Sequence, residues 1–101
     1  MIGKGLSTIR RFRNMTQSDL AKKINSTQEY ISKIEAEIHT PQKDMIKKIA
    51  DALDVSPILI VWFGVTEKDI ANDKVELYRT LKPTIDKLLN SLFNGKIPTL
   101  K

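Results

Sequence analysis

Residues 16–35 read TQSDLAKKINSTQEYISKIE, and this stretch decides the fold. Its apolar residues recur at helical spacing in two short runs, the first containing Leu20 and Ile24 and the second beginning at Ile31. Asn25 lies between the two runs, where the chain has to reverse, and asparagine tolerates the left-handed backbone conformation better than most residues. The stretch therefore predicts two short helices joined by a tight turn.

Polar residues mark where each of these helices begins. Thr16 is expected to cap the first helix, with Asp19 completing a box-like cap, and Thr27 is expected to cap the second, which ends near Glu35. Two short helices in this order form a helix-turn-helix, a motif that presents the beginning of its second helix to the major groove of DNA.

The same helical pattern extends on both sides of the motif. A preceding helix is expected from Lys4 or Leu6 to Arg13. A fourth helix is expected to begin at Pro41 with Thr40 as its cap, and a fifth at Ser56-Pro57, because proline suits the first helical position. Helices this short are stable only when they pack around a shared core.

Composition narrows the class of protein. The 101 residues carry a net charge of +5, which favours a polyanionic partner such as nucleic acid. There is no cysteine, no apolar signal segment, and no apolar run long enough to cross a membrane, so a cytoplasmic protein is expected. His39 is the only histidine and is expected to be solvated. The sequence has no plausible nucleophile–base set and no cluster with metal-ligand spacing, so we expect no enzyme activity, metal or cofactor.

From about Leu6 to Gly64, the order of these features resembles the DNA-binding domain of the Cro and lambdoid phage repressor (XRE) family. The resemblance rests on five elements in the right order, carried by Ile9-Arg10, Met15-Thr16-Gln17, Ile34-Glu35, Ile49-Ala50-Asp51-Ala52-Leu53 and Trp62-Phe63-Gly64. It implies an all-α fold, a five-helix lambda-repressor-like domain over residues 1–65. Residues 66–101 would form an appended C-terminal helical segment for dimerisation or interaction.

The resemblance also implies roles for single residues. The family positions that match Gln28, Glu29 and Lys33 read bases, and Ser32, one helical turn after the first two, is expected to reach base edges as well. The resemblance implies that Gln17 anchors a phosphate, and from their positions Thr16, Thr27, Tyr30 and Lys43 are expected to add contacts to the DNA backbone. Arg10 and Glu35 match a pair that in this family forms a partly buried, structural ion pair.

Two positions depart from the family pattern directly after Glu35. Family members usually carry a basic or amide residue followed by glycine, whereas this chain has Ala36 and Glu37. The departure removes one expected phosphate donor and adds a charge that DNA repels.

The C-terminal segment carries an apolar stripe with spacings of four, four, three and four residues, interrupted by Pro83, which either kinks one long helix or starts a second one. The stripe has two interpretations: it completes the core of its own domain, or it pairs with a second copy, and the second is favoured. The expected dimerisation residues are Leu77, Leu81, Ile85, Leu88 and Leu92.

The sequence therefore predicts a homodimeric repressor that binds double-stranded DNA at a palindromic operator. The alternative is an antitoxin-like interaction module, whose C-terminal helix binds a partner protein and for which DNA binding is secondary.

Overall fold

The structure is a computed structural model that describes residues 2–93, and these form helices and turns with no strand. It divides into two compact units, residues 1–65 and 66–101. Residues 94–101 of the expected C-terminal segment lie outside the described residues. No helix in residues 2–93 combines the length and apolarity needed to span a membrane.

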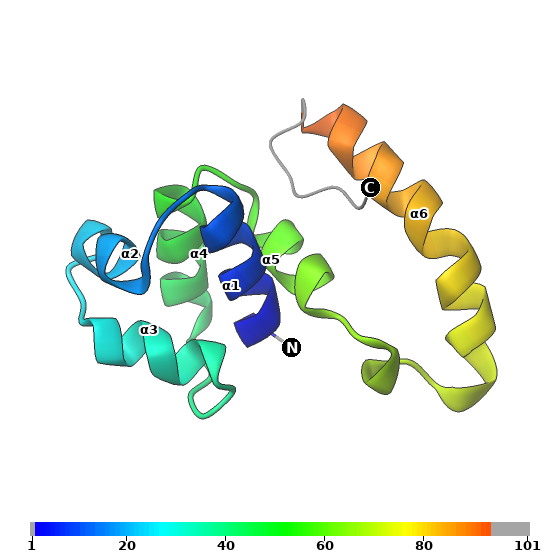
Figure 1. Ribbon diagram of the computed structural model, residues 1–101, viewed down its shortest axis with the longest axis horizontal. Helices are drawn as coiled ribbons and strands as arrows, with labels where there is room; N and C mark the ends of the chain where they lie inside the picture. Colours follow the sequence, from blue (N-terminus) through cyan, green and yellow to red (C-terminus); the bar gives the residue numbers. More distant parts are fainter. Residues whose placement is uncertain (1, 94–101) are drawn as a thin grey trace. The chain divides into compact units, whose positions relative to one another are not determined.

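The first unit contains five α-helices (Figure 1). They are α1 (Ile2–Phe12), α2 (Gln17–Lys23), α3 (Gln28–Glu35), α4 (Lys43–Ala52) and α5 (Pro57–Gly64). Helix α1 packs mainly on α5 and also on α3, while α2 packs on α3. The all-α, five-helix class predicted from the sequence is confirmed.

One shared core holds these short helices together. Each of the five helices contributes at least one side chain that is almost fully removed from water. Burying a leucine or isoleucine side chain stabilises a fold by about 1.5–3 kcal/mol, far more than the intrinsic propensity of a helix this short. The buried apolar residues are Leu6, Ile9, Leu20, Ala21, Ile24, Ile31, Ile34, Ile49, Ala50, Leu53, Leu59 and Ile60.

Helix α1 begins at Ile2, earlier than expected, and two glycines explain the difference. Gly3 and Gly5 are buried where α1 meets the end of α3 and the end of α5. A Cβ atom at Gly3 would collide with the carbonyl oxygen of Ile34, and one at Gly5 with that of Ile60. The glycines, which weaken a helix by propensity, are therefore the residues that allow this helix to approach its neighbours closely.

The expected start of the fourth helix is wrong. Helix α4 begins at Lys43 with Gln42 as its N-cap, and Thr40 makes no cap. Pro41 is instead buried in the extended segment that leads into the helix. Local capping residues suggested Thr40, but burial of the proline side chain delays the helix by two residues. The beginning of α5 agrees with expectation, with Ser56 at the N-cap and Pro57 at the first position.

The second unit consists of two 3₁₀ turns, η1 (Glu67–Asp69) and η2 (Asn72–Lys74), followed by α6 (Val75–Leu92). Helix α6 runs through Pro83 without ending, so the residues on both sides of the proline form one helix and not two. Arg79 on α6 donates to Glu67 on η1 with an Nε–Oε1 distance of 2.8 Å, which ties the turn to the helix.

Most of the expected stripe on α6 is exposed. Leu77, Leu81, Leu88 and Leu92 are 54%, 44%, 58% and 73% exposed, and Ile85 is half-buried. These leucines therefore do not form a core within the second unit itself.

Candidate nucleic-acid interface

The two helices of the motif begin at the threonines predicted to cap them. Thr16 Oγ1 accepts from the backbone N–H of Asp19 at 3.0 Å, and the Asp19 carboxylate accepts from the backbone N–H of Thr16 at 2.9 Å. That backbone hydrogen bond lowers the pKa of the Asp19 carboxyl below its ordinary value of 3.8. Thr27 Oγ1 accepts from the backbone N–H of Tyr30 at 3.1 Å. Each hydroxyl acts here as an acceptor, which leaves its own O–H free to donate to a phosphate oxygen.

The turn between α2 and α3 depends on Asn25 and Ala21. Asn25 adopts the left-handed conformation with φ 54°, as its place in the sequence predicts. Ala21 is buried, and its carbonyl accepts from the backbone N–H of Ser26 at 2.8 Å. The turn thus fixes the angle at which α3 leaves α2.

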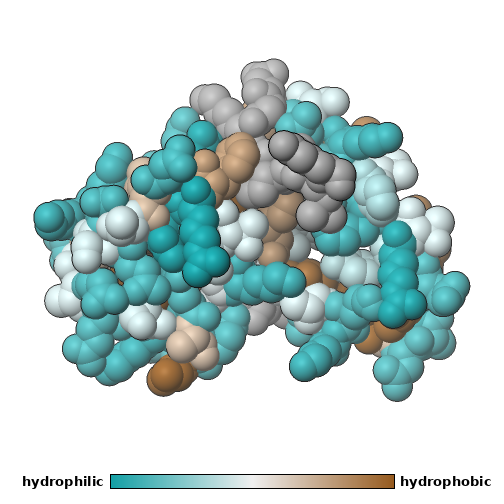
Figure 2. Space-filling view, viewed as in Figure 1, coloured by the Kyte–Doolittle hydropathy of each residue, from teal (hydrophilic) through white to brown (hydrophobic). Residues whose placement is uncertain are grey.

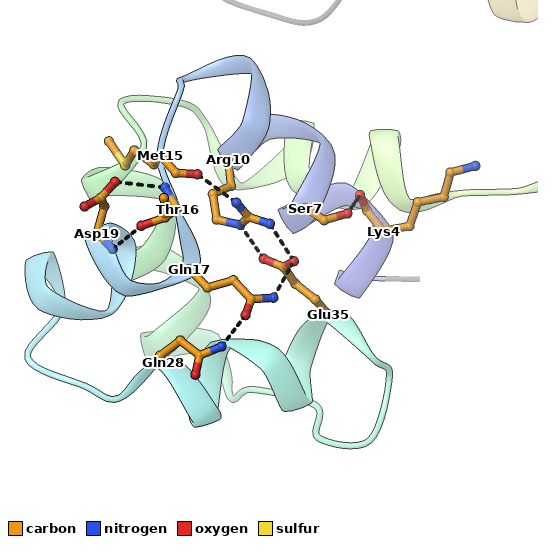
Figure 3. Close-up of polar contacts among 9 residues, drawn as sticks. All are labelled: Lys4, Ser7, Arg10, Met15, Thr16, Gln17, Asp19, Gln28 and Glu35. Atoms are coloured by element: carbon orange, nitrogen blue, oxygen red, sulfur yellow. Dashed lines mark hydrogen bonds and ion pairs between the residues drawn. The ribbon is translucent and has the colours of Figure 1, made fainter.

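Arg10 and Glu35 form an ion pair that links α1 to the end of α3 (Figure 3). Arg10 Nε lies 2.7 Å from Glu35 Oε2, Arg10 Nη2 lies 2.9 Å from Glu35 Oε1, and both side chains are only 8% exposed. The remaining Arg10 nitrogen, Nη1, donates to the carbonyl of Met15 at 2.7 Å, just before α2. This one guanidinium therefore fixes α3 and the start of α2 against α1.

Two glutamines continue this network to the beginning of α3. Gln17 Nε2 donates to Glu35 Oε1 at 3.1 Å, and Gln28 Nε2 donates to Gln17 Oε1 at 2.7 Å. Figure 3 shows the resulting chain of contacts, from Arg10 through Glu35 and Gln17 to Gln28. The exposed carboxamide of Gln28 is thus oriented by a buried ion pair.

The other candidate base-reading residues also lie on α3. Glu29 and Lys33 are exposed, and Ser32 is half-buried. Lys33 Nζ lies 3.2 Å from Glu29 Oε1, so the two charged candidates form an ion pair across one helical turn. Their spacing of four residues permits this contact, but the sequence does not show that the pair forms.

Comparison with known proteins now identifies the family. The sequence profile of the helix-turn-helix family matches residues 6–60, more than half of the chain. The chain belongs to the helix-turn-helix family. It is also 28% identical, over 93 residues, to the "Immunity repressor protein" of Bacillus phage phi105. That match covers 80% of this chain and 65% of the relative, so the chain spans a little under two-thirds of the relative's length. No solved structure matches the chain. The XRE-type resemblance inferred from the sequence is confirmed.

Basic side chains of this helix-turn-helix domain divide into two groups. Arg10 is held by Glu35, and Arg13 Nη2 donates to the carbonyl of Asp54 at 3.0 Å, so both serve the fold. Several lysines of α2 and α4 are instead exposed, and Figure 2 shows a largely hydrophilic surface over the first unit. The exposed lysines of α2 and α4 are Lys22, Lys23, Lys43, Lys47 and Lys48, and Lys4, Arg11 and Lys33 are exposed as well.

Glu37, which departs from the family pattern, has a structural role. It adopts the left-handed conformation with φ 61°, at the position where the family usually has glycine. Its Oε1 accepts from the backbone N–H of Gly3 at 2.8 Å, which satisfies one of the free donors at the beginning of α1. The charge that was expected only to repel DNA thus stabilises the contact between α1 and the end of α3.

The loop after α3 carries a second contact that the sequence did not reveal. The rings of Tyr30 and His39 lie 5.2 Å apart with a tilt of 56°. Together with Gln42, Asp44 and Met45 they line an open hollow at the beginning of α4. His39 is exposed, as expected, but it also packs on α3. Within residues 2–93, no group of three or more potential metal ligands comes together.

Proposed function

We propose that this chain is a sequence-specific transcriptional repressor that binds DNA as a homodimer, with α3 in the major groove. The contact between Gln17 and Gln28 is the observation that best supports this proposal. It holds an exposed carboxamide in place at the first turn of the helix whose beginning faces DNA in this motif.

The contact leaves Gln28 able to read a base. Its Nε2 carries two hydrogens, and only one is needed for Gln17. The second N–H and the carbonyl oxygen can pair with N7 and N6 of adenine, which is the usual bidentate contact of glutamine. Gln17 lies at the start of α2, where it can also meet a phosphate together with the hydroxyls of Thr16 and Thr27.

The exposed leucines of α6 support the homodimer. Exposed apolar side chains at helical spacing mark a surface that another molecule covers. A second copy of this chain fits best, because two copies related by a two-fold axis place two α3 helices in successive major grooves. The half-sites would then be about 10 bp, or roughly 34 Å, apart. Such a dimer represses by occluding polymerase, and the similarity to a phage immunity repressor supports this role.

In vitro selection from random duplex DNA, in about 150 mM salt to suppress bulk electrostatic binding, tests the proposal. We expect an enriched motif with two-fold symmetry. The Gln28→Ala variant should lose preference at one base position per half-site, at a cost of about 1–3 kcal/mol, while Lys43→Ala should weaken binding to all sequences evenly. A folded protein that enriches no motif contradicts the proposal.

Sedimentation equilibrium tests the dimer. We expect the wild-type chain to be a dimer and Leu81→Glu to be a monomer, because the charge would be buried in the apolar contact. Thr80→Glu is the matched control: it adds the same charge at an exposed neighbour, about 100° away around the helix, and should remain a dimer. A monomeric wild type would instead favour the alternative, in which the stripe binds a different protein.

A further inference from the structure

The ion pair between Glu29 and Lys33 lies on the surface of α3 that is predicted to read bases. The Lys33 Nζ to Glu29 Oε1 distance is 3.2 Å, and the two side chains are 52% and 76% exposed. A lone carboxylate in the major groove would be repelled by the phosphates on both sides. Paired with Lys33, it brings no net charge into the groove.

We infer that Glu29 and Lys33 read one base pair together, as a unit, and select G·C over A·T. This inference rests on the proposed function, since it requires that α3 enters the major groove. It makes the ion pair itself the element that recognises sequence, in place of two independent side chains.

The spacing of the ion pair matches the edge of a base pair. In both kinds of Watson–Crick pair, an exocyclic amine donates to a carbonyl oxygen, with a distance of about 2.7–3.2 Å between nitrogen and oxygen. The amine keeps one N–H, and the carbonyl keeps one lone pair, for the major groove. Lys33 Nζ can donate to the carbonyl while Glu29 accepts from the amine, and the 3.2 Å ion pair stays intact. Neither charge is then left unpaired when water is displaced.

The atoms on either side decide between the two kinds of base pair. In G·C, the carbonyl O6 lies beside N7, so the ammonium of Lys33 finds a second acceptor. In A·T, the amine N6 lies beside N7, whose lone pair repels the carboxylate of Glu29. The carbonyl O4 of thymine lies beside the C5-methyl group, which cannot accept from Lys33. The atoms beside the carbonyl and beside the amine thus both favour G·C when Glu29 and Lys33 bind as an ion pair.

The order of the two residues along α3 gives the base pair a direction. Glu29 precedes Lys33 by one turn, so the cytosine side of the pair faces the first turn of the helix. Exchanging the residues, in the variant Glu29→Lys/Lys33→Glu, rebuilds the ion pair with reversed direction. It should therefore select C·G in place of G·C at the same position of the half-site.

Selection from random duplex DNA with four proteins tests the inference. The wild type should prefer G·C at one position by about 5- to 150-fold, the range expected for a good two-point contact to a base pair. The exchanged variant should invert that base pair. Glu29→Gln and Lys33→Gln should each relax this same position, and all four should keep the preference set by Gln28.

Two results distinguish failure of joint reading by Glu29 and Lys33 from failure of the proposed DNA binding. If the wild type enriches a symmetric motif but the two single variants relax different positions, or the exchanged variant leaves the base pair uninverted, joint reading is wrong while DNA binding stands. If the wild type enriches nothing, the proposed function itself fails. Thermal melting of each variant by circular dichroism shows that the protein in the selection is folded, because lysine in the first turn of α3 costs about 0.3–1 kcal/mol in helix-dipole energy.

Discussion

The ion pair between Arg10 and Glu35 is almost fully buried and joins α1 to the end of α3, and Arg10 also bonds to the chain just before α2. Arg10 is only 6% exposed, and its guanidinium satisfies Glu35 and the carbonyl of Met15 at the same time. Taking both charges out of water is costly, so the pair need not be more stabilising than two apolar side chains. Removing one partner is a different matter, because it leaves the other charge buried and unpaired.

We therefore expect Glu35→Ala to lower the free energy of unfolding by about 3–5 kcal/mol. Glu29→Ala is the matched control, since Glu29 is on the same helix and pairs with a cation, yet it is exposed and should cost less than about 1 kcal/mol. Urea denaturation followed by circular dichroism measures both. Similar losses of stability in Glu35→Ala and Glu29→Ala would contradict this account. The double variant Arg10→Met/Glu35→Leu, which removes both buried charges, should recover most of the stability that Glu35→Ala loses.

Asn25 allows a test of backbone conformation alone, because its side chain is exposed. At φ 54°, alanine should be less stable than glycine by roughly 1–2 kcal/mol, since a Cβ atom is strained in the left-handed region. At Lys23, an exposed helical position, the order should reverse, with glycine less stable than alanine by roughly 0.5–1 kcal/mol. Thermal denaturation of the four variants measures both differences. An unchanged order at the two positions would show that the turn is not held in this conformation.

Some residue roles followed from the sequence because they depend on near neighbours. The left-handed Asn25 and the capping threonines belong to this group, since their partners are within a few positions. The role of Glu37 could not be predicted in this way, because its partner Gly3 is 34 residues away and no neighbouring residue indicates the contact. The hydrogen bond between Gln17 and Gln28 was missed for the same reason: it depends on how the two helices pack and on the rotamers that follow.

For the helices too, the sequence predicted what depends on near neighbours and missed what depends on distant contacts. Apolar spacing and capping residues predicted all five helices of the first unit, because each helix buries one face. The boundaries that were missed depend on tertiary packing. Burial of Pro41 delays α4, and the close approach of Gly3 and Gly5 to their neighbours lets α1 begin early.

Helix α6 continues through Pro83, a choice that the sequence left open. Proline removes one backbone hydrogen bond inside a helix, but it does not prevent the helix from continuing when the residues on both sides favour it. Only the coordinates decide between a continuous helix and two shorter ones, since both place the leucines on one stripe.

The tie between η1 and α6 should be visible in the titration of Glu67. Hydrogen bonding to Arg79 lowers the pKa of this carboxyl below its ordinary value of 4.5. A lowered carboxyl pKa means that the contact is fully present at neutral pH and is lost as the pH falls through that pKa. Arg79→Gln should therefore raise the pKa of Glu67 back toward 4.5, measured by NMR titration of the side-chain carboxyl.

Asp69, in the same turn, is the internal control for this titration. The backbone N–H of Thr66 lowers its pKa, and this hydrogen bond does not involve Arg79. Its pKa should stay low in the Arg79→Gln variant. If both carboxyls shifted together, the substitution would have unfolded the turn, and the separate tie to α6 would lose its support.

For the molecule as a whole, the number of basic side chains overstates how many are available for DNA, because some of them are bonded within the first unit. The chain carries +5, but Arg10 and Arg13 are engaged within the first unit. We therefore expect phosphate contacts from the exposed basic side chains, which include Arg11 and the lysines of α2 and α4, from the capping hydroxyls and from the backbone N–H groups at helix beginnings. Of these, the basic side chains set how affinity depends on salt, because they release the counterions held by DNA.

The salt dependence of operator binding tests this assignment and the dimer together. A dimer that makes about 6–10 phosphate contacts should lose roughly 10³–10⁵ in affinity between 50 and 200 mM salt. Lys43, exposed at the beginning of α4, occurs once in each subunit. Because each neutralised phosphate contributes about 0.9 to the slope of log affinity against log salt, Lys43→Gln should reduce the slope by nearly 2 for a dimer and by nearly 1 for a monomer. Fluorescence anisotropy over a salt series measures the slope.

Gln28→Ala provides the matched comparison, because it should weaken operator binding without changing the slope: its carboxamide carries no charge and releases no counterion. A slope that falls equally in both variants would mean that Gln28 acts on phosphates and not on a base. If the slope is unchanged in Lys43→Gln, Lys43 does not contact a phosphate, and the lysines of α2 become the better candidates for phosphate contacts. The two variants thus separate contacts to phosphates from contacts to bases. Only charged contacts to phosphates make the affinity depend on salt, and only contacts to bases make it depend on the DNA sequence.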